Sequence, residues 1–158
     1  MITYRPANAQ DFPSIDRLTS EANFQHFQLA PQLFAEPTLT ASCTSSAAFH
    51  QDEATKMSVA ELDGSVVGFV YASLVTETRP MFQPGRYAKI DTIAVQGNFR
   101  GNGIGHKLIN EIENWAQELG CTEVRLNVWS VNTRAIQLYE DLGYKPMSMF
   151  MGKRLGAA

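Results

Sequence analysis

A glycine-rich turn at residues 100–105, Arg-Gly-Asn-Gly-Ile-Gly, constrains the fold of this chain more than any other segment. It lies between a predicted strand at 86–95 and a predicted helix at 104–119, whose apolar side chains recur every three or four positions. Glycines let backbone N–H groups converge, and a helix start adds about half a positive charge. With Arg100 and Lys107 beside it, the turn is typical of a phosphate or pyrophosphate site; a loop that needs glycine only for its geometry is the alternative.

The spacing of these glycines excludes two common nucleotide-binding motifs. A dinucleotide fingerprint requires G-x-G-x-x-G, whereas the third glycine here follows after one residue and position 106 is His. A Walker loop requires Gly-Lys-Ser/Thr after four spacer residues, which His106-Lys107-Leu108 does not match. A plain nucleotide-binding protein is therefore disfavoured.

The rest of the pattern predicts one α+β domain over residues 1–158. A helix is expected after Asp11 as its cap, with Pro13 in the first turn, and Asp63-Gly64 is expected to form a hairpin turn. Residues 21–51 are expected to be broken helix and loop. Strands are predicted at 1–6, 57–62, 66–75, 86–95, 124–128 and 147–153, and further helices at 104–119 and 133–142, ended by Gly120 and Gly143.

Composition excludes several classes of protein. Hydrophobic residues make up 44% of the chain, which supports a packed core and excludes a disordered chain. The net charge of −3 disfavours nucleic-acid binding, and the longest uncharged apolar stretch, residues 66–75, is too short to cross a membrane. The N-terminus has no signal-peptide pattern, and the two cysteines, Cys43 and Cys121, form no disulfide framework. A cytoplasmic protein without a metal site is expected.

Two motifs together resemble the GNAT superfamily of acyl-CoA N-acyltransferases. The first is Arg/Gln-x-x-Gly-x-Gly/Ala, matched by Arg100, Gly103 and Gly105. The second motif begins at residue 132, after one further predicted helix and strand. It reads N-T-R-A-I-Q-L-Y-E-D-L-G-Y, with Asn132 and Tyr139 at matching positions. The resemblance is strong over residues 87–144, and the order of the preceding strands and helices also fits.

The resemblance implies a central mixed sheet of about six to seven strands flanked by about four helices and splayed between strands 4 and 5. Acetyl-CoA would lie in the splay, with its pyrophosphate on the glycine turn and its pantetheine arm along strand 4. The implied binding residues are Ile93, Ala94, Val95, Arg100, Gly101, Asn102, Gly103, Ile104, Gly105, His106 and Asn132. No metal is implied.

The implied reaction is direct transfer of an acetyl group from acetyl-CoA to a primary amine. The Tyr139 hydroxyl would lie near the thioester sulfur, where a tyrosine can donate a hydrogen bond as charge builds on the departing thiolate. Many relatives carry Glu five residues before the motif's Asn, but this chain has Asn127 there. Asp91, the one acid within strand 4, is therefore the candidate base, and its expected burial would raise its pKa. Water or a residue of the 77–86 loop remains an alternative.

The acceptor is the least determined part of the prediction. Residues 21–51 and 77–86 would form its side of the site, with Trp129, Phe24 and Phe27 as candidate lining residues. The amine could belong to a small molecule, a polyamine, an antibiotic, or a protein N-terminus or lysine. A homodimer is possible. The alternative function is a catalytically silent acyl-CoA-binding sensor or partner module. The absence of Glu at position 127 leaves this alternative open, whereas the presence of Tyr139 argues against it.

Overall fold

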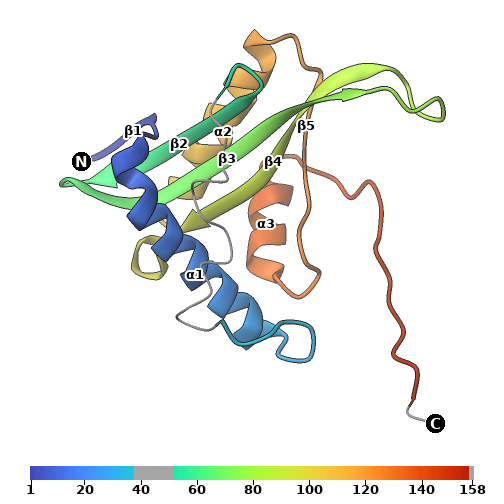
Figure 1. The fold of residues 1–158 in the computed structure, drawn as a ribbon, viewed down its shortest axis with the longest axis horizontal. Coiled ribbons are helices and arrows are strands. Elements are labelled where there is room, and N and C mark those ends of the chain that lie inside the picture. Colours follow the sequence, from blue (N-terminus) through green and yellow to red (C-terminus); the bar gives the residue numbers. More distant parts are fainter. Residues whose placement is uncertain (38–51, 157–158) are drawn as a thin grey trace.

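A computed structural model describes residues 1–37 and 52–156, which form one mixed sheet with helices on both faces (Figure 1). The sheet has the order β1-β2-β3-β4-β5, antiparallel throughout except for the parallel pair of β4 and β5. The strands are β1 (Ile2–Pro6), β2 (Thr55–Leu62), β3 (Ser65–Glu77), β4 (Gly85–Val95) and β5 (Glu123–Leu126). The α-helices are α1 (Phe12–Leu29), α2 (Ile104–Glu118) and α3 (Thr133–Asp141), and the short 3-10 helices are η1 (Ala9–Asp11) and η3 (Gly97–Phe99).

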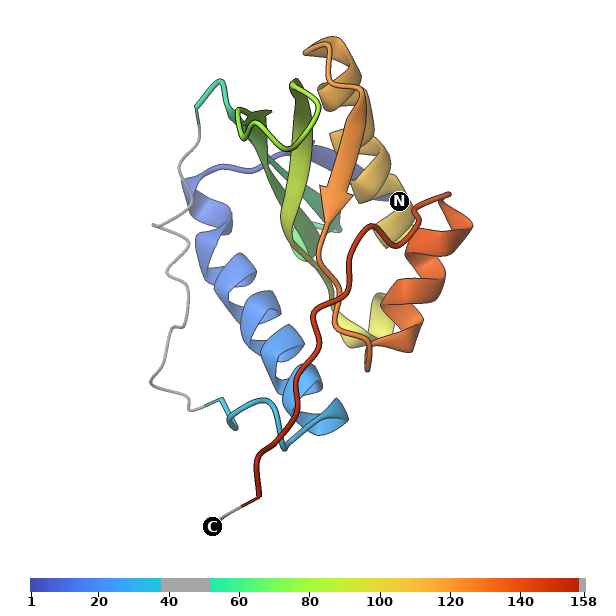
Figure 2. The same ribbon diagram turned by 90° about the vertical axis from the view of Figure 1, so that its right-hand side faces the viewer.

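The two faces of the sheet are covered by different helices, as Figure 2 shows. On one face, Ile15 and Leu18 of α1 are buried against a cluster that includes Phe69 of β3. On the other face, the apolar stripe of α2, including Leu108 and Ile112, is fully buried against β2, β3 and β4. Side chains that alternate along the strands give the sheet an apolar layer on each face. The buried apolar face predicted for the helix at residues 104–119 is confirmed.

Several local predictions are confirmed with small shifts in their limits. Asp63 and Gly64 both have positive φ, of 49° and 80°, as a two-residue hairpin turn requires. Gly120 and Gly143 end α2 and α3 with φ of 73° and 89°. Asp11 occupies the residue before α1, but its carboxylate makes no capping bond to that helix; it accepts hydrogen bonds from Asn8 N–H at 2.8 Å and from Arg5.

Two predictions about secondary structure are wrong. Residues 21–29 are not broken helix but the second half of α1, which runs for 18 residues. Residues 147–153 are not a strand in the structure, because they pair with no other strand. The mixed α+β fold is confirmed, with five strands and three α-helices in the described residues against the expected six to seven strands and about four helices.

The predicted splay between strands 4 and 5 is confirmed. The two strands pair only from Tyr87 to Ile90 of β4, opposite Glu123 to Leu126 of β5. Beyond Ile90, β4 continues for five residues to Val95 with only β3 as its neighbour. The β5-facing edge of this part of β4 therefore has no strand partner among the described residues, although Val95 O accepts a hydrogen bond from Arg100 Nε. The strand leads through η3 into the glycine turn.

Candidate active site

The free part of β4 begins at a β-bulge. Tyr71 of β3 pairs with Thr92 and the next residue, Ala72, pairs with Ile90, so Asp91 is an extra residue in β4. A bulge bends its strand and increases the local twist. Here it marks the point at which β4 diverges from β5, and it places Ile93, Ala94 and Val95 on the unpaired segment.

The glycine turn after η3 has the backbone conformation that its sequence predicts. Gly101 and Gly103 have φ of 83° and 75°, in the left-handed region that favours glycine. Gly103 is the residue before α2, and a Cβ built on it would meet no atom within 4 Å. Because the turn is exposed and not filled by packing, a ligand can approach its backbone closely.

The turn also presents backbone donors. Within residues 1–37 and 52–156, the backbone N–H groups of the five residues from Gly101 to Gly105 have no hydrogen-bond acceptor. The first N–H groups of an α-helix have no partner within the helix, and they favour an anion. Asn102 donates its side-chain amide to Phe99 O at 3.1 Å and so stabilises the turn internally. This arrangement fits the pyrophosphate of coenzyme A.

The cations around the turn have different surroundings. Arg100, a predicted binding residue, points back toward β4: its Nε donates to Val95 O at 2.7 Å, and its Nη2 lies 3.5 Å from Glu21 Oε1. The Lys107 Nζ lies over the Tyr4 ring, 5.5 Å from the centroid. Arg134 of α3 is different, because its Nη2 lies 3.6 Å from where a Gly101 Cβ would be and it forms no ion pair with the described residues. Sequence reasoning missed Arg134, since only the docking of α3 brings it to the turn.

Close packing of α3 on α2 holds the second motif against the first. A Cβ on Gly105 would lie 3.2 Å from Leu138 Cδ2, closer than most packed contacts, so the Leu138 side chain would have to shift to admit a larger residue there. Asn132 begins α3, and its side-chain oxygen accepts a hydrogen bond from Ala135 N–H at 3.2 Å. Gly105 and Asn132 therefore have structural roles in addition to the ligand contacts predicted for them.

Tyr139 lies in the core with its hydroxyl free. Its ring is buried on α3, 6.0 Å from the Tyr144 ring centre to centre. Burial raises the pKa of the Tyr139 phenol above its ordinary value, so the hydroxyl stays protonated at neutral pH. Among the described residues, the only fully buried side-chain oxygen without a partner is Ser58 Oγ. The unpartnered Tyr139 hydroxyl therefore keeps some contact with solvent.

Asp91 is not buried, and the expectation of burial is wrong. Its side chain retains about a quarter of its exposure, at 25%. One oxygen accepts a hydrogen bond from Ser73 Oγ at 2.5 Å, and the other pairs with Lys89 Nζ at 2.8 Å. The carboxylate is thus held in one orientation on the bulge, and its role as a base stays a prediction.

An aromatic cluster joins α1 to the loop after β5. The ring of Phe34 stacks on His26 at 5.3 Å and meets the Trp129 ring edge-on at 5.0 Å. Phe24 and Phe27 form a neighbouring pair at 6.2 Å. Trp129 and Phe24 remain partly exposed, so they are available to line an acceptor site as predicted, whereas Cys43 lies outside the described residues. Burial lowers the pKa of the His26 imidazole.

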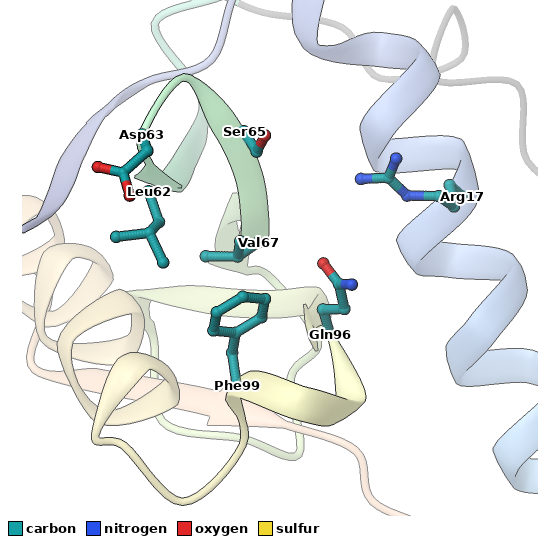
Figure 3. Close-up of a pocket in the computed structure, with 7 residues that line it drawn as sticks. All are labelled: Arg17, Leu62, Asp63, Ser65, Val67, Gln96 and Phe99. Atoms are coloured by element: carbon teal, nitrogen blue, oxygen red, sulfur yellow. The ribbon is translucent and has the colours of Figure 1, made fainter.

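A solvent-open hollow of about 410 Å³ lies elsewhere, between α1, the β2–β3 turn and η3. Figure 3 shows Arg17 on one side of it and Leu62 and Phe99 on the other. None of the predicted coenzyme A residues lines this hollow. Within residues 1–37 and 52–156, no group of three or more His, Cys, Asp or Glu side chains could hold a metal ion, and no helix has the length and apolar character that a membrane crossing requires.

Comparison with known proteins assigns this architecture to a family. The GNAT acetyltransferase family model matches residues 15–144. Thialysine N-epsilon-acetyltransferase from Bos taurus is 38% identical over 64 residues, which cover 40% of this chain and 38% of that protein. The match thus spans well under half the length of this curated relative.

Solved structures with the same fold align over nearly the whole chain. A mutant of the BH1408 protein from Bacillus halodurans has a TM-score of 0.85 and 25% identity, and it covers 97% of this chain and 99% of its own. The aminoglycoside N-acetyltransferase AAC(6')-Iy, in complex with a coenzyme A bisubstrate analogue, has a TM-score of 0.72 and 20% identity over 99% of both chains. With both motifs, the splayed sheet and the family match in agreement, this chain belongs to the GNAT acetyltransferase family.

Proposed function

We propose that this protein is an N-acetyltransferase that transfers the acetyl group of acetyl-CoA directly to a primary amine. The observation that carries the proposal is the junction of the unpaired end of β4 with the glycine turn. An edge without a strand partner is followed, through η3, by a set of unpartnered N–H groups. Family membership supplies the reaction class.

The proposed coenzyme A site has two parts. The backbone from Gly101 to His106 would hold the pyrophosphate, with Arg134 adding a positive charge and Arg100 holding the turn in place. The free edge from Ile93 to Val95 would bind the pantetheine arm through main-chain hydrogen bonds, as an added strand would, with Asn132 near the arm. Acetyl-CoA supplies an activated acetyl group as a thioester.

Tyr139 is proposed as the general acid. Its task is to donate a hydrogen bond to the thiolate that develops as the thioester bond breaks. A tyrosine, with a pKa of about 10, is a weaker acid than a thiol, with a pKa of about 8.5, so the phenol keeps its proton and stabilises the negative charge on sulfur through a hydrogen bond. Burial keeps the Tyr139 phenol protonated, and its hydroxyl makes no hydrogen bond to any of the described residues.

Asp91 is proposed as the group that removes a proton from the acceptor amine. An ammonium with a pKa near 10.4 costs about 4–5 kcal/mol to deprotonate at pH 7, so a nearby carboxylate assists either directly or through a water. Asp91 is the acid on the bulge where β4 and β5 part, and Ser73 and Lys89 fix its orientation. Its exposure gives an amine access to it.

The acceptor is proposed to be a cationic amine that enters on the side of the aromatic cluster. Partly exposed rings such as Trp129 attract ammonium groups through cation–π contacts. The named relatives include an enzyme for thialysine and an enzyme for aminoglycosides, both of which carry primary amines. These similarities support a small amine, although a peptide amine has the same reacting group.

The proposal is tested by release of free thiol from acetyl-CoA over a panel of amines: thialysine, lysine, polyamines, aminoglycosides and peptides with free N-termini. We expect acceptor-dependent thiol release with at least one small amine, and mass spectrometry should show the acetylated product. Binding of acetyl-CoA with no thiol release on any acceptor would support the sensor alternative. An absence of acetyl-CoA binding in calorimetry would overturn the proposed site itself.

A further inference from the structure

Lys89 holds a primary amine against the carboxylate that is proposed to take the acceptor's proton. Its Nζ lies 2.8 Å from Asp91 Oδ1. The sequence has five lysines, all within residues 1–37 and 52–156, and Lys89 alone among them forms an ion pair with an acidic side chain of those ranges. Because a primary amine is also the proposed acceptor group, Lys89 has the chemistry of a substrate.

The strand determines the side of the sheet on which this amine lies. Ala88 and Ile90 are buried in the cluster that packs against α2, so Lys89 between them projects from the opposite face, against which α1 packs. The Lys89 side chain is 40% exposed, which leaves its amine free to turn. Ser73 donates its hydroxyl to the second Asp91 oxygen at 2.5 Å, so the carboxylate stays oriented when the amine moves.

The proposed position of acetyl-CoA directs its thioester toward this ion pair. With the pyrophosphate at residues 101–106 and the arm along residues 93–95, the ligand runs back along β4, and its acyl end lies toward Asp91. Lys89 and Asp91 are on either side of Ile90, the last residue of β4 that pairs with β5. The amine and the carboxylate therefore lie where the two strands part, at the acyl end of the proposed site.

We propose that Lys89 is an acetyl acceptor of its own active site, so that the protein acetylates itself at this residue when acetyl-CoA is bound and no other amine is present. This inference rests on the proposed function, because it uses the same acetyl-CoA and the same carboxylate. An amine that is held beside the reacting groups reacts as if it were present at a very high concentration. Self-acetylation therefore needs no acceptor from solution.

The chemical step is the proposed acetyl transfer with an internal amine. The Lys89 ammonium gives one proton to Asp91, which passes it to solvent, and the neutral Nζ attacks the carbonyl carbon of the thioester. The N–C bond forms, the C–S bond breaks, and the second proton that leaves the nitrogen balances the thiolate as free thiol. The new amide has no charge, so the ion pair is lost and Asp91 keeps its hydrogen bond from Ser73.

Mass spectrometry of the intact protein and of its peptides, after incubation with acetyl-CoA alone, tests the proposal. Lys56 of β2 is the internal control: it too is a partly buried strand lysine, but its neighbour Met57 is buried on the α1 side, so Lys56 projects from the other face. We expect acetylation at Lys89 to be faster than at Lys56 by about tenfold or more. Lys89→Arg retains a positive charge beside Asp91 and should lose this added acetyl group.

The kinetics separate self-acetylation from simple chemical modification. The rate at Lys89 should saturate with acetyl-CoA and should not depend on protein concentration. A rate no faster than that at Lys56, or one that rises linearly with acetyl-CoA, would overturn the proposal. A rate that rises with protein concentration would show transfer between copies and would overturn it as well.

The amine panel distinguishes a failure of this inference from a failure of the proposed function. Thiol release on an external amine, by a protein that leaves Lys89 unmodified, would overturn self-acetylation alone. An absence of acetyl-CoA binding in calorimetry would overturn both. Protein that is already acetylated at Lys89 after purification, with Lys56 unmodified, would support the inference in the same way as the incubation.

Discussion

The carboxylate of Glu21 accepts a hydrogen bond from the backbone N–H of Gly97 at 2.6 Å, and this contact joins α1 to the segment that precedes the glycine turn. The same Glu21 oxygen lies 3.5 Å from Arg100 Nη2. The turn is therefore held from behind by α1 and by the Arg100 bond to Val95 O. With Arg100 engaged in this way, we expect binding of an anion at the front of the turn to rely on backbone N–H groups and on Arg134.

Gly103→Val tests the position of the pyrophosphate. A β-branched residue is strained at a φ of 75°, and its side chain would occupy the space in front of the turn. We expect coenzyme A affinity in calorimetry to fall at least tenfold. Gly64→Val is the control, because Gly64 has a φ of 80° and open space but lies in the β2–β3 turn. Both variants should lose about 1–2 kcal/mol of stability. Equal affinities of the two variants for coenzyme A would contradict the proposed site.

Arg134→Ala is expected to act mainly on coenzyme A affinity, and Arg100→Ala mainly on stability. Arg134 is exposed, so its removal should weaken coenzyme A binding about fivefold, as for a surface ion pair of up to about 1 kcal/mol, and the difference should shrink in high salt. Arg100 bonds to the protein itself, so its removal should lower the free energy of unfolding by about 1 kcal/mol and weaken binding only modestly. Calorimetry at two salt concentrations, with urea unfolding, separates the two. A salt-independent effect of Arg134→Ala would reject its role as a phosphate contact.

Asp91→Asn tests the proposed base. The amide can still accept a hydrogen bond from Ser73 but cannot take a proton, so turnover should fall by about 10²–10⁴. The remaining rate should rise with pH as the amine itself loses its proton. Ser73→Ala is the control, because it removes the positioning hydrogen bond and leaves the carboxylate. A pH–rate profile that keeps both its height and its shape in Asp91→Asn would show that a water accepts the proton instead.

Glu77 makes the acid stability of the fold testable. Hydrogen bonds from the Arg79 side chain and backbone lower the pKa of this buried carboxyl to about 2, from an ordinary value of about 4.5. A lowered pKa means that the stabilisation is complete above about pH 4.5 and is lost as the pH falls toward 2. The difference in free energy of unfolding between wild type and Glu77→Gln should be constant from pH 7 to pH 5 and shrink below pH 4.5. A difference that does not change with pH would contradict the ion pair.

Features set by neighbouring residues were predictable from sequence, and features set by distant contacts were not. The limits of α2, its glycine end and the Asn132 cap of α3 depend on residues within one turn, so the expectations are close to the structure. The full length of α1 was missed, because its second half has no regular apolar stripe and is held by rings such as Phe34 and Trp129. Residues 147–153 were predicted as a strand from their alternation, but a strand also needs an edge to pair with.

In the candidate site too, features set by neighbouring residues were predictable from the sequence and features set by distant contacts were not. The conformation of the glycine turn was predicted from the spacing of its residues, which reflects local backbone geometry. Tyr139 came from the resemblance to the second family motif, and its role stays a prediction. The position of Arg134 beside Gly101 depends on how α3 packs on α2, and the exposure of Asp91 depends on a bulge of one residue in β4. Neither leaves a signal in a single sequence.

The central claim is that the Tyr139 hydroxyl supports the departing thiolate, and Tyr139→Phe tests it most directly against Tyr144→Phe. The two rings pack together, but the Tyr144 hydroxyl donates to Glu113 Oε1 at 3.0 Å, so its loss should lower stability and leave turnover per folded molecule unchanged. Tyr139→Phe keeps the ring and should lower the maximal rate by about 10²–10³, with acetyl-CoA affinity and melting temperature nearly unchanged. Steady-state kinetics on the accepted amine, with calorimetry of each folded variant, gives the answer. A folded Tyr139→Phe protein with wild-type turnover would contradict the claim and make this tyrosine a core residue only.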